Sequence, residues 1–113
     1  MLREFEYTKA FRQGEILIFK LKKKPNFYGR SPIRVRNGVI RVGEKEGHEH
    51  KVDGNGQLSM FDNKEDGIIE VPKGETATVT HPEHKDVKLE AGTYAVKTQK
   101  EATGKRTQSS VKD

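Results

Sequence analysis

Residues 15–21 read Glu-Ile-Leu-Ile-Phe-Lys-Leu, and this stretch decides the fold class of the 113-residue chain. It is the most apolar segment, and its apolar residues occupy consecutive positions rather than every second one. A short run that is apolar on both faces of an extended chain is typical of a β-strand covered on both sides. The segment therefore predicts a strand inside a protein built from sheets.

Shorter apolar runs follow this strand every eight to twelve residues, separated by Gly, Pro, Asn and Asp. No segment shows sustained helical periodicity. We therefore predict one all-β domain over residues 1–100, either a small β-barrel or a β-sandwich. About nine short strands are expected, at residues 15–21, 33–36, 39–42, 48–52, 57–61, 68–71, 75–81, 87–89 and 93–99.

Three turns and the tail complete this outline. Asn37-Gly38 favours the positive φ values of a type I′ turn, which predicts a β-hairpin between the second and third runs. Residues 71–74 and 89–92 each place two residues and a Gly after an apolar run, which predicts two equivalent corners. Residues 101–113 are polar, so we expect a tail that stays disordered unless a partner orders it.

Composition excludes several classes of protein. The chain has no cysteine, which excludes disulfide scaffolds and thiolate metal sites. Its longest uncharged apolar run covers residues 16–19, which is too short for a membrane span. The first residues contain no apolar core of a secretory signal. We expect a soluble protein of the cytoplasm or, if phage-encoded, of the virion.

All four histidines lie in two motifs, Gly-His-Glu-His at residues 47–50 and His-Pro-Glu-His at residues 81–84. On a strand, the two histidines of the first motif point to the same face. Pro82 forces a bend that can bring the two histidines of the second motif together. Neutral imidazole binds zinc, iron and nickel. We predict a divalent transition-metal site with His48, His50, His81 and His84 as candidate ligands, and the sequence leaves open whether His84 joins the other three.

The role of this site stays open at the sequence level. Three imidazoles with an open position form a catalytic arrangement, whereas four close the site. Glu83 and Asp86 are candidates for further ligands or for outer groups that orient an imidazole. Charged residues also surround both motifs, so the alternative is that the histidines lie on an ordinary wet surface.

Gly43 followed by His-Glu-His at residues 48–50 resembles the first cupin motif, and Gly67 followed by Pro-Lys-Gly at residues 72–74 resembles the second. This resemblance implies a cupin-like barrel. The chain departs from the pattern because Ala77 stands where the histidine of the second motif would fall. His81 shares strand parity with Ala77 and can reach the same interior.

Other segments point to a second resemblance: Arg-Gln-Gly-Glu-Ile-Leu-Ile at residues 12–18, both histidine motifs, Leu-Glu-Ala-Gly-Thr-Tyr at residues 89–94 and Gln-Lys-Glu at residues 99–101. Together they resemble a family of small, uncharacterised proteins from bacterial and phage genomes. Ala102 stands where this family has an aromatic residue. The resemblance implies no activity.

Charge is segregated along the chain, which carries a net charge of +5. Residues 1–42 hold 11 basic and 3 acidic side chains, whereas residues 43–90 hold 6 basic and 12 acidic ones. Basic groups neutralise phosphates and aromatic rings stack on bases, which makes a loop over residues 20–36 a candidate contact for nucleic acid or another polyanion. Its candidate residues are Lys20, Lys22, Lys23, Lys24, Phe27, Tyr28, Arg30, Arg34 and Arg36.

This loop supports a second, non-enzymatic hypothesis. The protein would be an accessory or decoration subunit that binds an acidic partner, an assembly partner or another copy of itself through the loop and the tail. The opposite interpretation is that the basic residues pair with acidic ones inside the fold and that the two aromatic residues belong to the core.

Overall fold

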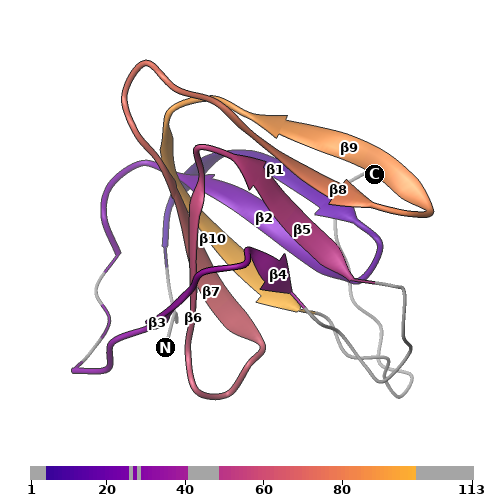
Figure 1. Ribbon diagram of the computed structural model, residues 1–113. Coiled ribbons are helices and arrows are strands. Elements are labelled where there is room, and N and C mark those ends of the chain that lie inside the picture. Colours follow the sequence, from indigo (N-terminus) through magenta and orange to yellow (C-terminus); the bar gives the residue numbers. More distant parts are fainter. Residues whose placement is uncertain (1–4, 26, 28, 41–48, 99–113) are drawn as a thin grey trace.

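The computed structural model describes residues 5–25, 27, 29–40 and 49–98, and these residues form ten strands and no helix (Figure 1). The strands make two antiparallel sheets, in the orders β1-β2-β10-β7-β6-β3 and β4-β5-β8-β9. The predicted all-β class is confirmed. The strands are β1 (Tyr7–Gln13), β2 (Ile16–Leu21), β3 (Ile33–Val35), β4 (Val39–Ile40), β5 (His50–Gly54), β6 (Gln57–Met60), β7 (Asp66–Val71), β8 (Ala77–His81), β9 (His84–Leu89) and β10 (Gly92–Thr98).

Strand β2 is covered on both faces, as its sequence predicts. Ile16 and Ile18 are fully buried in the main core, which also contains residues of the four-stranded sheet. Leu21 belongs to a second apolar cluster with Phe61 and Ile68. Since successive side chains of a strand point to opposite faces, the six-stranded sheet buries apolar groups on both of its sides.

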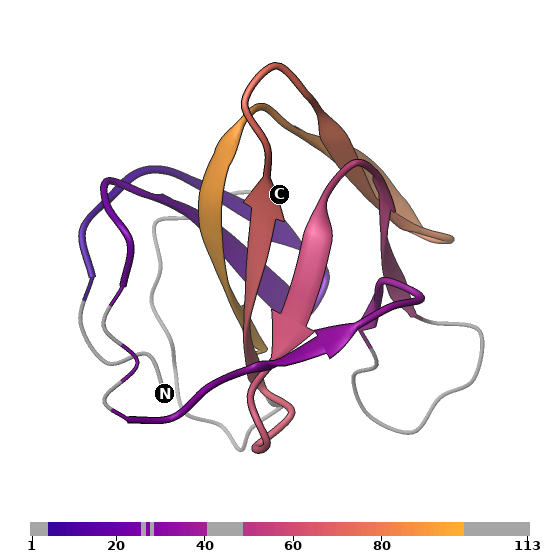
Figure 2. The same ribbon diagram turned by 60° about the vertical axis from the view of Figure 1, so that its left-hand side comes forward.

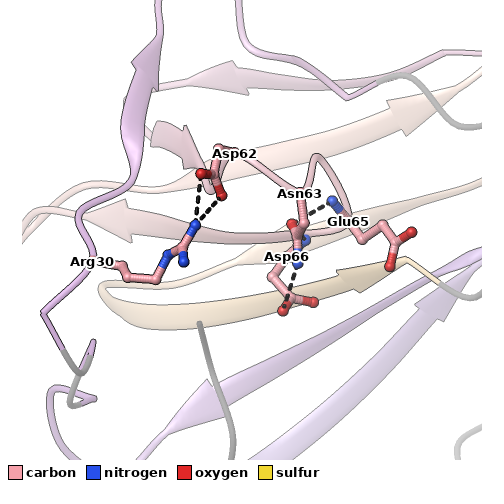
Figure 3. Close-up of polar contacts among 5 residues, drawn as sticks. All are labelled: Arg30, Asp62, Asn63, Glu65 and Asp66. Carbon is pink, nitrogen blue, oxygen red and sulfur yellow. Dashed lines mark hydrogen bonds and ion pairs between the residues drawn. The ribbon is translucent and has the colours of Figure 1, made fainter.

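The chain between β2 and β3 takes part in this second cluster. Phe27 packs against it and meets Phe61 in an edge-on contact with ring centroids 5.4 Å apart. Next to this contact, one terminal nitrogen of Arg30 donates to both carboxylate oxygens of Asp62, at 2.7 and 2.6 Å (Figure 3). The loop is therefore held against the β6–β7 connection by an aromatic pair and an ion pair.

The sequence-based strand list missed β1, which is an edge strand and, among the described strands, pairs only with β2. Lys9 and Gln13 interrupt the apolar alternation of this segment, and the register shifts between Tyr7 and Lys9. Both features hide the period of two that identifies a half-buried strand.

The predicted hairpin at Asn37-Gly38 is wrong, because β3 pairs with β6 whereas β4 pairs with β5. The chain crosses here from one sheet to the other (Figure 2). Gly38 has a φ of 70°, but Asn37 does not adopt the positive φ that a type I′ turn requires. A Cβ on Gly38 would lie 2.7 Å from the carbonyl oxygen of Val52, so close packing of β5 requires the glycine.

The two predicted corners do have equivalent roles. Residues 72–76 carry the chain from β7 of the larger sheet to β8 of the smaller one. Residues 90–91 carry it back, from β9 to β10. The predicted tail, residues 101–113, lies outside the described residues.

The loop between β6 and β7 depends on Asn63. Its side-chain oxygen accepts hydrogen bonds from the backbone N–H groups of Glu65 at 2.8 Å and Asp66 at 3.1 Å (Figure 3). We expect Asn63→Ala to lower the free energy of unfolding by about 1 kcal/mol, because both N–H groups lose this acceptor. Urea unfolding measures the effect, and Asn55→Ala is the matched control.

Asn55 donates to the exposed carboxylate of Glu75 instead of fixing backbone groups. Its replacement is therefore expected to change the free energy of unfolding by less than about 0.5 kcal/mol. Equal effects of the two alanine substitutions would contradict the role assigned to Asn63.

Candidate metal centre at the histidine cluster

Three imidazoles meet where the β1–β2 turn, the β8–β9 turn and the start of β5 come together, at the right-hand end of the molecule in Figure 1. The ring centroids of His50 and His81 are 4.5 Å apart, and those of His81 and His84 are 4.7 Å apart. The structure thus brings together one histidine of the first motif and both of the second. His48 lies outside the described residues.

The β8–β9 hairpin places two of the rings. His81 and His84 are direct partners across the Pro82-Glu83 turn, and direct partners project to the same face of a sheet. Between this pair and the next one, Val79 with Val87, β8 advances two residues and β9 three. This bulge in β9 turns His84 towards the interior side.

Gln13 connects the cluster to both sheets. Its side chain is fully buried, and its amide nitrogen donates to the carbonyl oxygens of Val79 at 2.9 Å and Lys85 at 2.7 Å. Its amide oxygen therefore acts as the acceptor, and it lies 2.8 Å from Nδ1 of His50. This network assigns the proton of neutral His50 to Nδ1 and leaves the lone pair on Nε2.

That lone pair is buried and unused. His50 is fully buried, and its Nε2 has no hydrogen-bond partner among the described residues. Burial, with a smaller contribution from the nearby His81, lowers the pKa of His50 to about 4 against the opposing effect of Glu15. His50 is therefore neutral at pH 7. Oε1 of Glu15 lies 3.7 Å from this Nε2.

His81 is oriented differently. The backbone N–H of Glu83 donates to Nδ1 of His81 at 3.0 Å, so the neutral ring carries its proton on Nε2. This ring can coordinate an ion only after its Nε2 loses the proton or its Nδ1 gives up the contact with the N–H of Glu83. Glu83 thus orients His81 through its backbone, while the side chain of Asp86 is exposed.

Gly14 brings the β1–β2 turn close to the rings. Gly14 and Glu15 are the two central residues of this turn. Gly14 has a φ of 60° and Glu15 has no positive φ, which is the geometry of a type II′ turn and favours glycine at the first position. A Cβ on Gly14 would lie 2.9 Å from Nε2 of His84 and 3.5 Å from Cε1 of His50. The missing side chain leaves space beside both rings.

Three contributors at this turn, Gln13, Gly14 and Glu15, had no functional role in the sequence-based prediction. The segment that contains them carried the family resemblance, but a single sequence does not reveal that a glutamine at the end of an edge strand turns inward. In the described part of the chain, no three His, Cys, Asp or Glu side chains meet the geometry of a metal site as they stand.

The predicted polyanion residues have mixed environments. Phe27 packs in the second apolar cluster, and Tyr28 lies outside the described residues. Three of the basic residues form ion pairs, namely Lys20 with Glu90, Lys24 with Glu70 and Arg30 with Asp62. The remaining four are exposed, namely Lys22, Lys23, Arg34 and Arg36.

Comparison with known protein families identifies a match over most of the chain. A family model described as a domain of unknown function, DUF8820, matches residues 12–99. No curated protein and no solved structure matches the chain. The part that the structure describes contains no helix that could cross a membrane.

Proposed function

The chain belongs to the DUF8820 family, whose function is unknown, and from its histidine cluster we propose that it binds a divalent transition metal. The proposed ligands are Nε2 of His50, Nε2 of His84 and the carboxylate of Glu15. His81 lines the same site through its protonated Nε2. Three protein ligands leave coordination positions open, as catalytic metal sites do.

The unpaired Nε2 of His50 is the observation that carries this proposal. Buried polar atoms in proteins nearly always have a partner, and an exception calls for an ion or a water molecule. Gln13 fixes the tautomer in the way that outer groups do in known metal sites, where the ligand histidine donates its second N–H to an acceptor. A neutral imidazole also binds a metal without first losing a proton.

The spacing of the rings fits a shared ion. Two imidazoles bound to one metal at about 2.1 Å have centroids about 4.5–5.2 Å apart for angles of roughly 90–109°. The two separations that involve His81, 4.5 Å to His50 and 4.7 Å to His84, lie within this range, so the three rings are packed as closely as rings that share an ion. The two proposed ligand rings, His50 and His84, both lie beside Gly14. Two donor atoms on one metal lie about 3.0–3.4 Å apart by the same geometry. Glu15 and His50 are a few tenths of an ångström farther apart, and Glu15 lies in an exposed turn.

Zinc, nickel and cobalt binding to the full chain, purified without a histidine tag, tests the proposal. We expect bound metal by elemental analysis and a melting temperature that rises with metal concentration. His50→Asn is the decisive variant, because the asparagine amide can keep the donor to Gln13 while Nε2 is removed. Since loss of an outer group already costs about 10–100-fold in metal affinity, we expect His50→Asn to lose at least about 100-fold.

Asp86→Asn is the matched control. Asp86 belongs to the same sequence region, but its side chain is exposed, so its substitution should leave the metal affinity unchanged within about twofold. Absence of metal binding, or equal affinities of wild type and His50→Asn, rejects the proposal.

The interaction hypothesis stays a prediction. Three basic residues of the candidate loop at residues 20–36 already form ion pairs within the chain, which leaves fewer unpaired charges for an acidic partner. The cupin-like barrel, the phage or virion origin and self-association likewise remain proposals that the metal site does not depend on.

A further inference from the structure

A cleft of about 600 Å³ opens beside the histidine cluster. It lies where β1, the edge of the larger sheet, runs close to β9, the edge of the smaller one, and the two strands share no ladder of backbone hydrogen bonds. His84 belongs both to the cluster and to the wall of the cleft. Phe11, Arg12 and Lys88 line the cleft with it.

Arg12 is the cationic side chain of this cleft that is best placed to bind an anion. Its Nε–H donates to the carbonyl oxygen of Gly14 at 3.2 Å, which holds the guanidinium at the turn that touches His84. No carboxylate pairs with Arg12 among the residues that the structure places. A half-buried guanidinium that is held at one nitrogen and unpaired at the other two is suited to a bidentate contact with an oxyanion.

The other lining residues narrow the class of ligand. Glu83 and Asp86 also line the cleft, and their carboxylates repel a highly charged anion. Lys85 and Lys88 keep the net charge of the cleft positive. Phe11 offers an apolar wall. A monoanionic carboxylate with an apolar body satisfies all of these groups, whereas a phosphate dianion meets repulsion from the two carboxylates.

We propose that this cleft binds a small apolar carboxylate, with Arg12 holding the carboxylate group and Phe11 packing against the apolar part. The ligand then lies beside His84 and the metal, so its role as a substrate or metal co-ligand rests on the proposed function. Binding of the carboxylate itself does not need the metal, and it is tested without it.

The test is a titration of the full chain in EDTA with benzoate, followed by backbone amide shifts. We expect saturable shifts at Phe11, Lys85 and Lys88, with benzamide and inorganic phosphate binding at least about tenfold more weakly. Arg12→Gln is expected to weaken benzoate binding at least about tenfold. Arg34→Gln is the matched control, because Arg34 is exposed on β3 and does not line the cleft.

Three results overturn the inference: no saturable benzoate binding, equal binding to wild type and Arg12→Gln, or phosphate binding as tightly as benzoate. Zinc affinity is measured in parallel on both arginine variants. Retained zinc affinity in Arg12→Gln supports a subsite separate from the ligands, whereas its loss shows that Arg12 supports the metal centre instead. Absence of zinc binding in every variant rejects the metal proposal and leaves the benzoate result to stand alone.

Discussion

Replacing Gln13 with alanine is expected to lower the free energy of unfolding by about 3–5 kcal/mol, a large part of the roughly 5–15 kcal/mol that stabilises a typical domain. The residue joins three elements. Its amide donates to carbonyl groups of β8 and β9 and accepts from His50 of β5. These bonds connect β1 of the larger sheet to the smaller sheet, across edges that share no backbone ladder.

The expected size follows from burial. Each ordinary intramolecular hydrogen bond contributes about 1 kcal/mol, but a buried group left without a partner costs about 1–3 kcal/mol. Gln13→Ala deprives the Nδ1–H of His50 and two carbonyl groups of this partner, and it also leaves a cavity beside a fully buried position. Gln13→Met keeps most of the volume and removes only the hydrogen bonds.

Urea unfolding of both variants separates the two contributions. We expect Gln13→Met to lower the free energy of unfolding by more than half as much as Gln13→Ala does. The Nδ1–H resonance of His50 should shift in both variants. Gln57→Ala is the matched control, because Gln57 is exposed on β6 and should change the free energy by less than about 0.5 kcal/mol. If Gln13→Met is as stable as the wild type, the hydrogen-bond network does not stabilise the fold.

The all-β class and most of the strands follow from the sequence because they depend on local periodicity. Residues 15–21 are apolar on both faces, and β2 is indeed buried on both faces. The Asn37-Gly38 turn could not be predicted in the same way. Its glycine is required by a contact with Val52 of another strand, and Asn-Gly at that place does not form a hairpin.

The candidate site was predictable only in part, for the same reason. The bend at Pro82 is a local feature that allows His84 to lie beside His81, and the sequence left this placement open; in the structure the two rings are neighbours. The approach of His50 depends on pairing between β5 and β8, which is a tertiary contact. The roles of Gln13 and Arg12 depend on where β1 ends relative to β9, and β1 itself was missed.

The second large effect is a loss of folding stability at low pH that is linked to His50. The pKa of His50 is lowered to about 4 in the folded protein, mainly by burial, whereas an unfolded histidine titrates near 6.5. The unfolded state therefore binds a proton at a higher pH than the folded state does. The stability linked to neutral His50 is complete above about pH 6.5 and is lost as the pH falls from 6.5 to 4.

We expect this residue alone to lower the free energy of unfolding by about 3 kcal/mol between pH 7 and pH 4, from 1.4 kcal/mol per pH unit. Three titratable side chains face the ring of His50, namely Glu15, His81 and His84. Glu15 favours the protonated ring and the two histidines oppose it, but burial has the largest effect on its pKa.

Urea unfolding in EDTA at pH 7, 5.5 and 4 measures this dependence in wild type and in His50→Asn. The variant keeps a donor for Gln13 but cannot titrate, so its pH dependence should be weaker by about 3 kcal/mol over this range. Carboxylates elsewhere titrate in both proteins and cancel in the difference. Parallel curves for the two proteins would show that His50 gains its proton as easily in the fold as in the unfolded chain, which contradicts a buried, unpaired Nε2.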